Sequence, residues 1–353
     1  VALNKDSNNS FAIESATVTK SCRKRRNVMV FLALVLILIL NALFALDHQQ
    51  VMDSVDTAAE CSSQASRHHH SPSKEQVTMV IMTYNRSDTL INNPIVTELM
   101  PLKEVAEIVI IWNDVSNPEG MQKLRNQLVE RIPSLEPKLR MRLSKRNSLN
   151  NRFLPDNEIQ TEAIFTIDDD WLIRRNNFLQ GFGWWQENQH RLVGFTPRIL
   201  IDNGINGTKY HTFWHIGKIL EEVQEEGYNT LLPGGGLFLH RRYFDAFWQD
   251  QQKFMEGREM VDRLFNCEDL MLNFIIPPAF HPPLLVAIDM EESLAYVFNQ
   301  KQALSKRGGH IITRGSTCLA TLKSLFGWPF IMSRTICSEP TSIALNISRA
   351  AEP

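Results

Sequence analysis

The sequence predicts an α/β protein, in which a sheet carries helices on its faces and is preceded by one transmembrane helix. The composition is that of a folded protein, because 43% of the 353 residues are apolar and the net charge is only -2. Short apolar runs alternate with polar, helix-like stretches over residues 77–353, as in α/β sheets. One longer apolar stretch lies near the N-terminus. The near-neutral charge argues against a nucleic-acid partner.

The apolar stretch at residues 28–46 is expected to cross a membrane. It contains one polar residue, Asn41, and as a helix it would span roughly 28 Å, close to the thickness of a bilayer core. Four basic residues, 23–26, precede it, so the positive-inside rule places residues 1–27 in the cytoplasm as a short tail. A cleaved signal peptide is the alternative, but its apolar core is usually only about 7–15 residues long. We therefore expect a single-pass, type II signal-anchor.

Residues 47–76 are expected to be a stem, because they are rich in Ser, His, Gln and Asp. Three adjacent histidines, 68–70, are more typical of solvated side chains than of a metal site. The folded, lumenal part is predicted to be residues 77–353.

The five cysteines fall on both sides of the expected membrane. Cys22 would be cytoplasmic, as a free thiol or a palmitoylated one. The other four would be lumenal, where disulfides persist, and their spacing leaves three pairings open: these are Cys61, Cys267, Cys318 and Cys337. Cys61 could instead link two chains.

Apolar runs within the folded part predict the strands, and helical spacing predicts the helices. The predicted strands are residues 77–82, 107–112, 162–167, 191–196 and 284–288. Helices are expected before residue 107, over 121–131 and after 267. Trp184 and Trp185 are expected either in the core or as a platform for a sugar.

Each of the first three strands is followed by a polar cluster. Residues 83–86 (TYNR) follow the first, Asn113 and Asp114 follow the second, and Asp168, Asp169 and Asp170 follow the third. Ligands of α/β sheets bind outside the carboxyl ends of the strands, so these clusters predict a binding site.

The run of three aspartates carries most weight. Adjacent carboxylates repel, and a hard divalent cation that also takes phosphate oxygens would compensate them. By itself such a run is more often a solvated turn, but its place at a strand end favours the metal. The basic residues 146 and 152 could hold phosphate, ribose or base, or could simply be solvated. Glu268 and Asp269 could be ordinary acidic residues of a first helical turn.

Taken in order, TYNR, WND, RNSLNNRF, FTIDDDW, VGFTPR and NCEDLMLNF resemble the glycosyltransferase family 64 catalytic domain of the exostosin family. The resemblance runs from residue 77 to at least 318. It implies a GT-A fold with a Rossmann-like mixed sheet, a UDP-sugar donor, and Mn²⁺ or possible Mg²⁺. It further implies retaining transfer of GlcNAc, GalNAc or a related sugar to a glycan or glycolipid, in the Golgi or endoplasmic reticulum membrane.

The resemblance also implies roles for single residues. Asp170 matches the metal ligand, Asp269 the carboxylate at the anomeric face of the sugar, and Arg314 the arginine beside the donor diphosphate. Cys267 and Cys318 match the family's disulfide. The donor-binding positions are matched by Arg86, Asn113, Asn147, Arg152, Asp168, Asp169 and Glu268.

The sequence departs from the family at a few places. Glu268 stands where Asp is common, and the spacing from Arg314 to Cys318 leaves Arg307 as a competitor for the diphosphate. Residues 234–236 (GGG) replace a Gly-Ala segment on the acceptor side, so the acceptor stays open.

Two other functions are compatible with the same features. One is a catalytically silent GT-A-like subunit that binds and stabilises a partner glycosyltransferase. The other is a metal-dependent phosphohydrolase. A homo- or heterodimer is compatible with each of these functions. The retained aspartates argue against the silent subunit.

Glycosylation tests the expected topology. The sequons at Asn206 and Asn346 should be exposed to the lumen, whereas a glycan on Asn85 would block the predicted donor site beside Arg86. Glycopeptide mass spectrometry of protein from eukaryotic cells should therefore find Asn206 occupied, Asn346 partially occupied, and Asn85 bare. The absence of any glycan would contradict the type II orientation.

Overall fold

The computed structural model describes residues 73–202, 208–212, 229–232, 236–286 and 309–330. Several predictions lie outside these residues: the tail, the anchor, most of the stem with its histidines, Cys22, Cys61, Cys337, Asn206, Asn346, Gly234, Gly235 and Arg307. Among the helices of the described ranges, none is long and apolar enough to cross a membrane.

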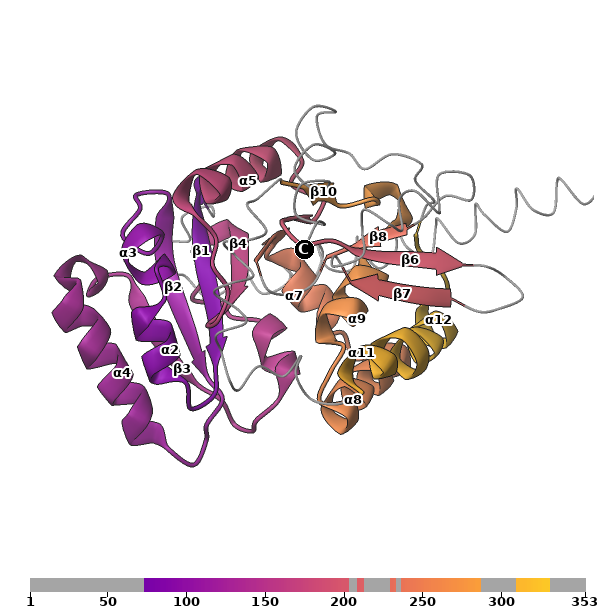
Figure 1. Cartoon of the computed structure of the whole chain (residues 1–353), viewed down its shortest axis with the longest axis horizontal. Helices are drawn as coiled ribbons and strands as arrows, with labels where there is room; N and C mark the ends of the chain where they lie inside the picture. The colour runs from indigo at the N-terminus through magenta and orange to yellow at the C-terminus, as the bar shows by residue number, and fades with distance from the viewer. Residues whose placement is uncertain (1–72, 203–207, 213–228, 233–235, 287–308, 331–353) are drawn as a thin grey trace, which may run out of the picture. The chain divides into compact units, whose positions relative to one another are not determined.

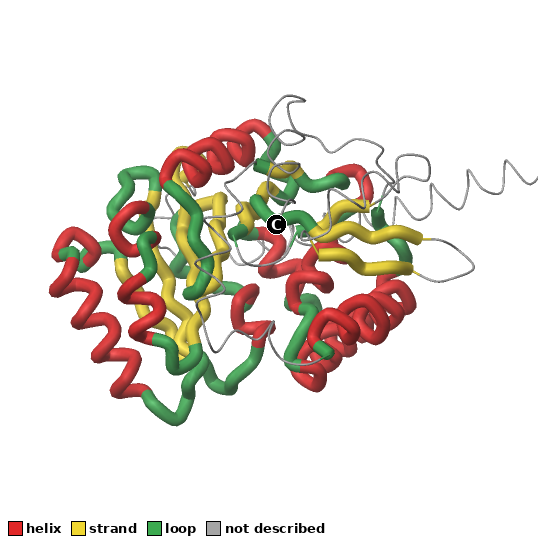
Figure 2. Tube along the Cα trace, viewed as in Figure 1, coloured by secondary structure: helices red, strands yellow, loops and turns green. Residues whose placement is uncertain are grey.

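The centre of the fold is a seven-stranded mixed sheet in the order β10-β5-β9-β4-β1-β2-β3 (Figures 1 and 2). β1 pairs in parallel with both β2 and β4, whereas β9 runs antiparallel to β4 and β5. The bounds of its strands are β1 Ser73–Thr83, β2 Val105–Trp112, β3 Leu139–Leu143, β4 Thr161–Asp168, β5 Val193–Gly194, β9 Leu237–His240 and β10 Leu284–Leu285.

Both faces of this sheet are buried. Successive side chains of β1 point to opposite faces, so that Met79 and Ile81 enter one hydrophobic cluster and Val80 and Met82 enter the other. Full burial of each such side chain stabilises the fold by about 1.5–3 kcal/mol. Continuous apolar runs are typical of strands covered on both sides, which is why β1, β2 and β4 are recognisable in the sequence.

The helices that cover the sheet come from several parts of the chain. In Figure 1, α2, α3 and α4 lie beside the strands β1 to β3, and α8, α9 and α12 pack against one another. The bounds are α2 Ser87–Asn92, α3 Ile95–Glu98, α4 Pro118–Arg131, α5 Arg175–Glu187, α7 Arg242–Phe247, α8 Gln252–Leu264, α9 Glu268–Ile275, α11 His310–Thr313 and α12 Leu319–Phe326. Shorter turns are η1 Pro133–Leu135, η2 Leu149–Phe153, η5 Pro278–Phe280 and the π-helical η7 Arg314–Cys318.

A second, three-stranded antiparallel sheet lies beside η7. Its order is β7-β6-β8, with bounds β6 Arg198–Asp202, β7 Thr208–Thr212 and β8 Asn229–Leu231. A Cβ at Gly315 would come within 3.1 Å of the Cβ of Tyr210. Glycine at this position therefore lets η7 approach β7 closely.

The structure corrects several predicted bounds. β1 begins at Ser73, so the last residues assigned to the stem belong to the sheet. The strand predicted over 191–196 shrinks to the residue pair of β5, and of the strand predicted over 284–288 the described residues 284–286 contain only the residue pair of β10. A run of apolar residues indicates that the segment is buried. A buried segment need not form the backbone hydrogen bonds of a strand, so the predicted strands are longer than the observed ones.

A disulfide joins Cys267, at the start of α9, to Cys318, at the end of η7, with 6.3 Å between the two Cα atoms. The turn from α8 into α9 is unusual, because Phe265 and Cys267 both have positive φ, at 47° and 78°. Such left-handed backbone costs roughly 1–2 kcal/mol for a residue other than glycine. The disulfide thus fixes a costly turn directly beside Glu268 and Asp269.

Removing this disulfide should destabilise the fold substantially. The bond closes a loop of 51 residues, which predicts a loss of roughly 3–4 kcal/mol in the free energy of unfolding for the Cys267→Ser/Cys318→Ser variant. Urea denaturation measures this loss, and reduced wild-type protein is the matched control. Non-reducing peptide mapping that paired Cys267 with Cys61 or Cys337 would contradict the assignment.

Candidate functional site

The three polar clusters predicted at the strand ends lie next to one another. β1 is the neighbour of both β2 and β4, and all three run parallel. Their carboxyl ends therefore bring Arg86, Asn113 and the aspartates after β4 to one edge of the sheet. This edge is the candidate active site.

Arg86 neutralises two of the three aspartates. Its two terminal nitrogens lie 2.5 Å from Asp169 Oδ1 and 2.7 Å from Asp170 Oδ2. The Thr83 hydroxyl donates to the other oxygen of Asp169 at 2.6 Å. Asp169 is 0% exposed, so its carboxylate faces the protein rather than a ligand, whereas that of Asp170 lies nearer the surface.

The pKa values of these carboxylates reflect their burial. Burial raises the pKa of Asp169 to about 7, against the opposing charge of Arg86. Burial also raises the pKa of Asp170. Burial thus disfavours the ionised form of both carboxylates even beside Arg86, and a divalent ion would add positive charge that favours it.

Asn93 fixes the backbone of the aspartate turn. Its side-chain nitrogen donates to the carbonyl of Asp169 at 3.1 Å and to that of Trp171 at 2.8 Å. The sequence analysis did not select Asn93, because an isolated asparagine carries no pattern. The turn that presents Asp170 is thus held from the loop between α2 and α3.

Arg152 links the third aspartate to α9. It is 4% exposed, forms an ion pair with Asp168, and has its Nε 3.7 Å from Glu268 Oε1. Burial raises the pKa of Glu268 to about 7, with the neighbouring charge of Asp269 acting in the same direction. Arg152 therefore bridges the end of β4 and the first turn of α9.

Asn113 holds the loop that leads to Arg152. Its Nδ2 donates to the carbonyl of Ser148 at 2.9 Å, and its Oδ1 accepts from Ser144 Oγ at 2.7 Å and from Asn151 Nδ2 at 2.8 Å. Asn113 is buried, whereas Asn147 lies exposed on this loop. In the structure Asn113 positions the loop, and Asn147 faces the solvent.

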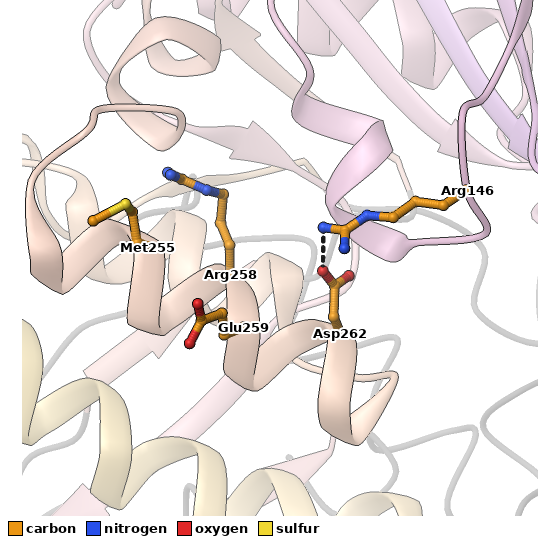
Figure 3. Close-up of a pocket in the computed structure, with 5 residues that line it drawn as sticks. All are labelled: Arg146, Met255, Arg258, Glu259 and Asp262. Atoms are coloured by element: carbon orange, nitrogen blue, oxygen red, sulfur yellow. Dashed lines mark hydrogen bonds and ion pairs between the residues drawn. The ribbon is translucent and has the colours of Figure 1, made fainter.

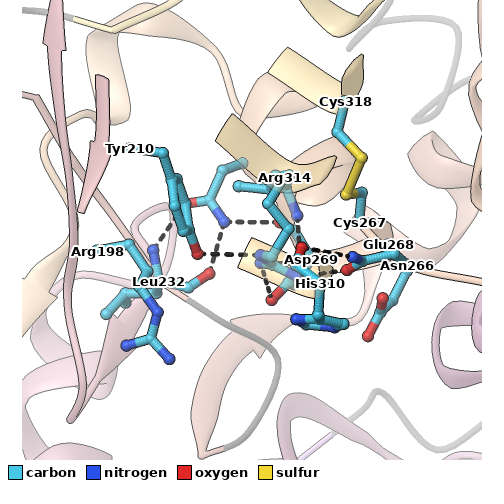
Figure 4. Close-up of polar contacts among 12 residues, drawn as sticks. Arg198, Tyr210, Leu232, Asn266, Cys267, Glu268, Asp269, His310, Arg314 and Cys318 are labelled. Carbon is cyan, nitrogen blue, oxygen red and sulfur yellow. Dashed lines mark hydrogen bonds and ion pairs between the residues drawn. A yellow bond between two sulfur atoms is a disulfide. The ribbon is translucent and has the colours of Figure 1, made fainter. Parts of the chain in front are cut away.

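The second half of the site is a buried ion pair between Asp269 and Arg314 (Figure 4). Arg314 Nη2 lies 2.6 and 2.7 Å from the two oxygens of Asp269. Its Nε donates to Tyr210 Oη and its Nη1 to Asn266 Oδ1, both at 3.0 Å. Burial acts to raise the pKa of Asp269, but the charge and hydrogen bonds of Arg314 outweigh burial and hold the pKa below its usual value. Asp269 is therefore kept ionised.

Among the described residues, the aspartates at the end of β4 are the carboxylates best placed to take a divalent cation. Within the described ranges, no group of three or more His, Cys, Asp or Glu side chains converges on one point. Asp170, with Asp168 beside it, offers one or two carboxylates. That set fits ions such as Mg²⁺ or Mn²⁺ that bind through one or two carboxylates, water and substrate phosphates.

Other predicted residues lie apart from this site. Trp185 is fully buried in the core, and Trp184 packs against the same cluster. Arg146 forms an ion pair with Asp262 on α8, and neither Asp262 nor Tyr210 was selected from the sequence.

Three exposed apolar side chains lie at or just after the ends of β1, β2 and β3. These are Tyr84, Val115 and Leu143.

The comparisons with known proteins agree on one family. The profile of the glycosyl transferase family 64 domain matches residues 77–341. Glucosamine inositolphosphorylceramide transferase 1 of Arabidopsis thaliana is 33% identical over 233 residues, which cover 63% of this chain and 26% of that protein. Exostosin-2 of Mus musculus is 28% identical over 260 residues, covering 72% of this chain and 33% of its own length.

The chain spans about a quarter to a third of the length of these two relatives. Exostosin-like 2 of Mus musculus is 24% identical, and the match covers 76% of this chain and 79% of that protein. A solved mannosyltransferase from Pyrobaculum calidifontis, in complex with GDP-Man and Mn²⁺, aligns at a TM-score of 0.40 and 13% identity over 86% of this chain and 88% of its own. A similarity this low does not establish a shared fold. With a family profile that matches most of its length, the chain belongs to the glycosyl transferase family 64 domain family of exostosin-like glycosyltransferases.

Proposed function

We propose that this chain is a retaining glycosyltransferase of GT-A type that transfers an N-acetylhexosamine or a related sugar from a UDP-sugar to a glycan or glycolipid hydroxyl. Mn²⁺, or Mg²⁺ in its place, would assist. The observation that supports it most is that three arginines pair with the carboxylates at this end of the sheet. Arg86 pairs with Asp169 and Asp170, Arg152 pairs with Asp168 and lies near Glu268, and Arg314 pairs with Asp269. These side chains lie where a nucleotide diphosphate and its sugar would have to meet.

The reaction breaks the bond between the anomeric carbon and the donor phosphate. The bonding electrons leave with the diphosphate, the acceptor oxygen forms the new bond to the anomeric carbon, and the acceptor proton passes to a diphosphate oxygen or solvent. A divalent ion held by Asp170 would supply positive charge to the leaving diphosphate. Arg86 and Arg152 are placed to support that charge.

Asp269 would act at the anomeric carbon. Positive charge develops there as the sugar–phosphate bond breaks, and a fixed, ionised carboxylate stabilises it. Arg314 keeps Asp269 ionised and fixes both of its oxygens. Tyr84 offers an exposed ring at the same edge, on which a base could stack.

The acceptor class is proposed from the relatives. The Arabidopsis relative is named for glucosamine and inositolphosphorylceramide, which makes an amino sugar and a ceramide-based lipid the first candidates to test. Attachment through residues 28–46 in the Golgi or endoplasmic reticulum, with the catalytic part in the lumen, would place the site beside such lipids.

Donor binding should require a divalent ion. Calorimetry with UDP is expected to show binding in MnCl₂ that is lost in excess chelator, because the carboxylates at residues 168–170 repel a diphosphate without a cation between them. Asp170→Asn should weaken Mn²⁺-dependent UDP binding by at least about tenfold, or ~1.4 kcal/mol. The control is Asp250→Asn, an exposed aspartate outside the site. Equal UDP affinity with and without the ion would refute the metal assignment.

Asp269→Asn should reduce turnover far more than donor affinity. Its carboxylate is placed to act in the transition state, so kcat should fall by more than about tenfold, ~1.4 kcal/mol of barrier, while UDP affinity changes by less than about threefold. Glu268→Gln should be milder. The unfolding temperature of each variant must be measured in parallel, because the change leaves Arg314 buried without its partner. A turnover within tenfold of wild type would show that Asp269 has another role. UDP release in the absence of any acceptor-dependent transfer would instead favour a phosphohydrolase.

A further inference from the structure

One carboxylate on α8 gathers several donors from the loop that precedes Arg152. Arg146 Nη2 lies 2.5 Å from Asp262 Oδ2, and Asn150 Nδ2 donates to Asp262 Oδ1 at 3.0 Å. The Ser148 hydroxyl donates to the same Oδ1. Figure 3 shows Arg146 reaching from the loop toward Asp262, on the helix that also carries Met255, Arg258 and Glu259.

The hydrogen bonds from Ser148 and Asn150 to Asp262 hold the loop more firmly than the ion pair of Arg146 does. The side chain of Arg146 is 65% exposed, and an ion pair this open to solvent adds little stability. Ser148 and Asn150 are buried, and hydrogen bonds from buried donors to an ionised acceptor are strong and costly to break. Asp262 therefore fixes the loop mainly through its buried residues Ser148 and Asn150.

The same stretch of chain is also held from the opposite side. The carbonyl of Ser148 accepts from Asn113 Nδ2, and its hydroxyl caps η2 by accepting from the backbone nitrogen of Asn150 at 3.1 Å. η2 contains Arg152, which forms an ion pair with Asp168 and lies near Glu268. Asn113 thus fixes the loop from β2 and Asp262 fixes it from α8, so that Asn147 and Arg152 are presented in one arrangement.

We propose that Asp262 is a positioning residue for the nucleotide: it holds the loop of residues 144–151 in the shape that binds the donor, without contacting the donor itself. This inference rests on the proposed function, because it assumes that the loop receives UDP. Among the described residues, the side chain of Asp262 bonds to the loop and not to Asp269 or Arg314, so its effect is on donor binding rather than on the chemical step.

The test compares Asp262→Asn with Glu259→Gln in the full chain. Glu259 lies on the same helix and is exposed, and within the described part of the chain it makes no ion pair, so it is a matched control. In calorimetry with UDP and MnCl₂, Asp262→Asn should raise the Kd by about tenfold, while Glu259→Gln should stay within about twofold of wild type. The KM for the UDP-sugar should rise in parallel, with kcat changed by less than about twofold.

Hydrogen exchange supplies a second readout that does not depend on activity. The amides of residues 144–151 should exchange faster in Asp262→Asn than in wild type, while those of β1 and β4 should not change. If Asp262→Asn does not fold, Ser148→Ala removes one of the same hydrogen bonds and should also raise the Kd for UDP.

Two results would overturn the inference: a folded Asp262→Asn variant with wild-type UDP affinity and loop exchange, or a fall in kcat with no change in Kd or KM. Failure of wild-type protein to bind UDP would refute the proposed function instead. In that case, unchanged loop exchange in Asp262→Asn would still refute the positioning role.

Discussion

Negative charge buried at the carboxyl end of the sheet has to be neutralised, and the arrangement of the site depends on how this is done. An uncompensated buried charge costs several kcal/mol. Arg86 forms ion pairs with Asp169 and Asp170. Arg152 pairs with Asp168 and Glu268, and Arg314 pairs with Asp269. These arginines come from the end of β1, from η2 and from η7. Charge neutralisation therefore docks distant parts of the chain onto one another.

The same pairs suit a site for a charged substrate. A diphosphate brings negative charge that arginines can accept, and a divalent cation brings positive charge that carboxylates can accept. Arg86 and Asp170 already contact each other, so a metal–diphosphate complex would exchange partners with them and leave little net charge unpaired. The Asp269–Arg314 pair is buried, and both carboxylate oxygens of Asp269 accept hydrogen bonds from Arg314, which fixes the orientation of the carboxylate. The half of the site proposed to bind is thus open to exchange, whereas the half proposed to react is fixed.

The sequence predicted those parts of the fold whose pattern is local. β1, β2 and β4 are continuous apolar runs, and α4 and α9 show helical spacing, so each was located to within a few residues. β3 was missed because it is an edge strand in which Arg140 and Arg142 interrupt the apolar pattern and bind Asp156. β9 was missed because four residues are too few to show a period.

The candidate site divides in the same way. Clusters such as the three aspartates are visible because they are contiguous and follow an apolar run. Asp262, Asn93 and Tyr210 are single polar residues, and each gains its role from a partner far away in the sequence. Asp262 meets Ser148 across 114 positions, and Tyr210 meets Arg314 across 104. Only the folded chain brings such partners together.

The position of Arg314 in the chain has a consequence for synthesis. The polypeptide leaves the ribosome N-terminus first, and folding can begin before translation ends. The ion-pair partners of Arg86 are complete once Asp170 has been made, whereas Asp269 lies 45 residues before Arg314, and Cys267 lies 51 residues before Cys318. A nascent chain halted between these points would contain Arg86 and both of its aspartates, but its Asp269 would lack both hydrogen bonds from Arg314. The residues of the two halves of the site therefore emerge at different times, and Asp269 gains its arginine later than Asp169 and Asp170 gain theirs.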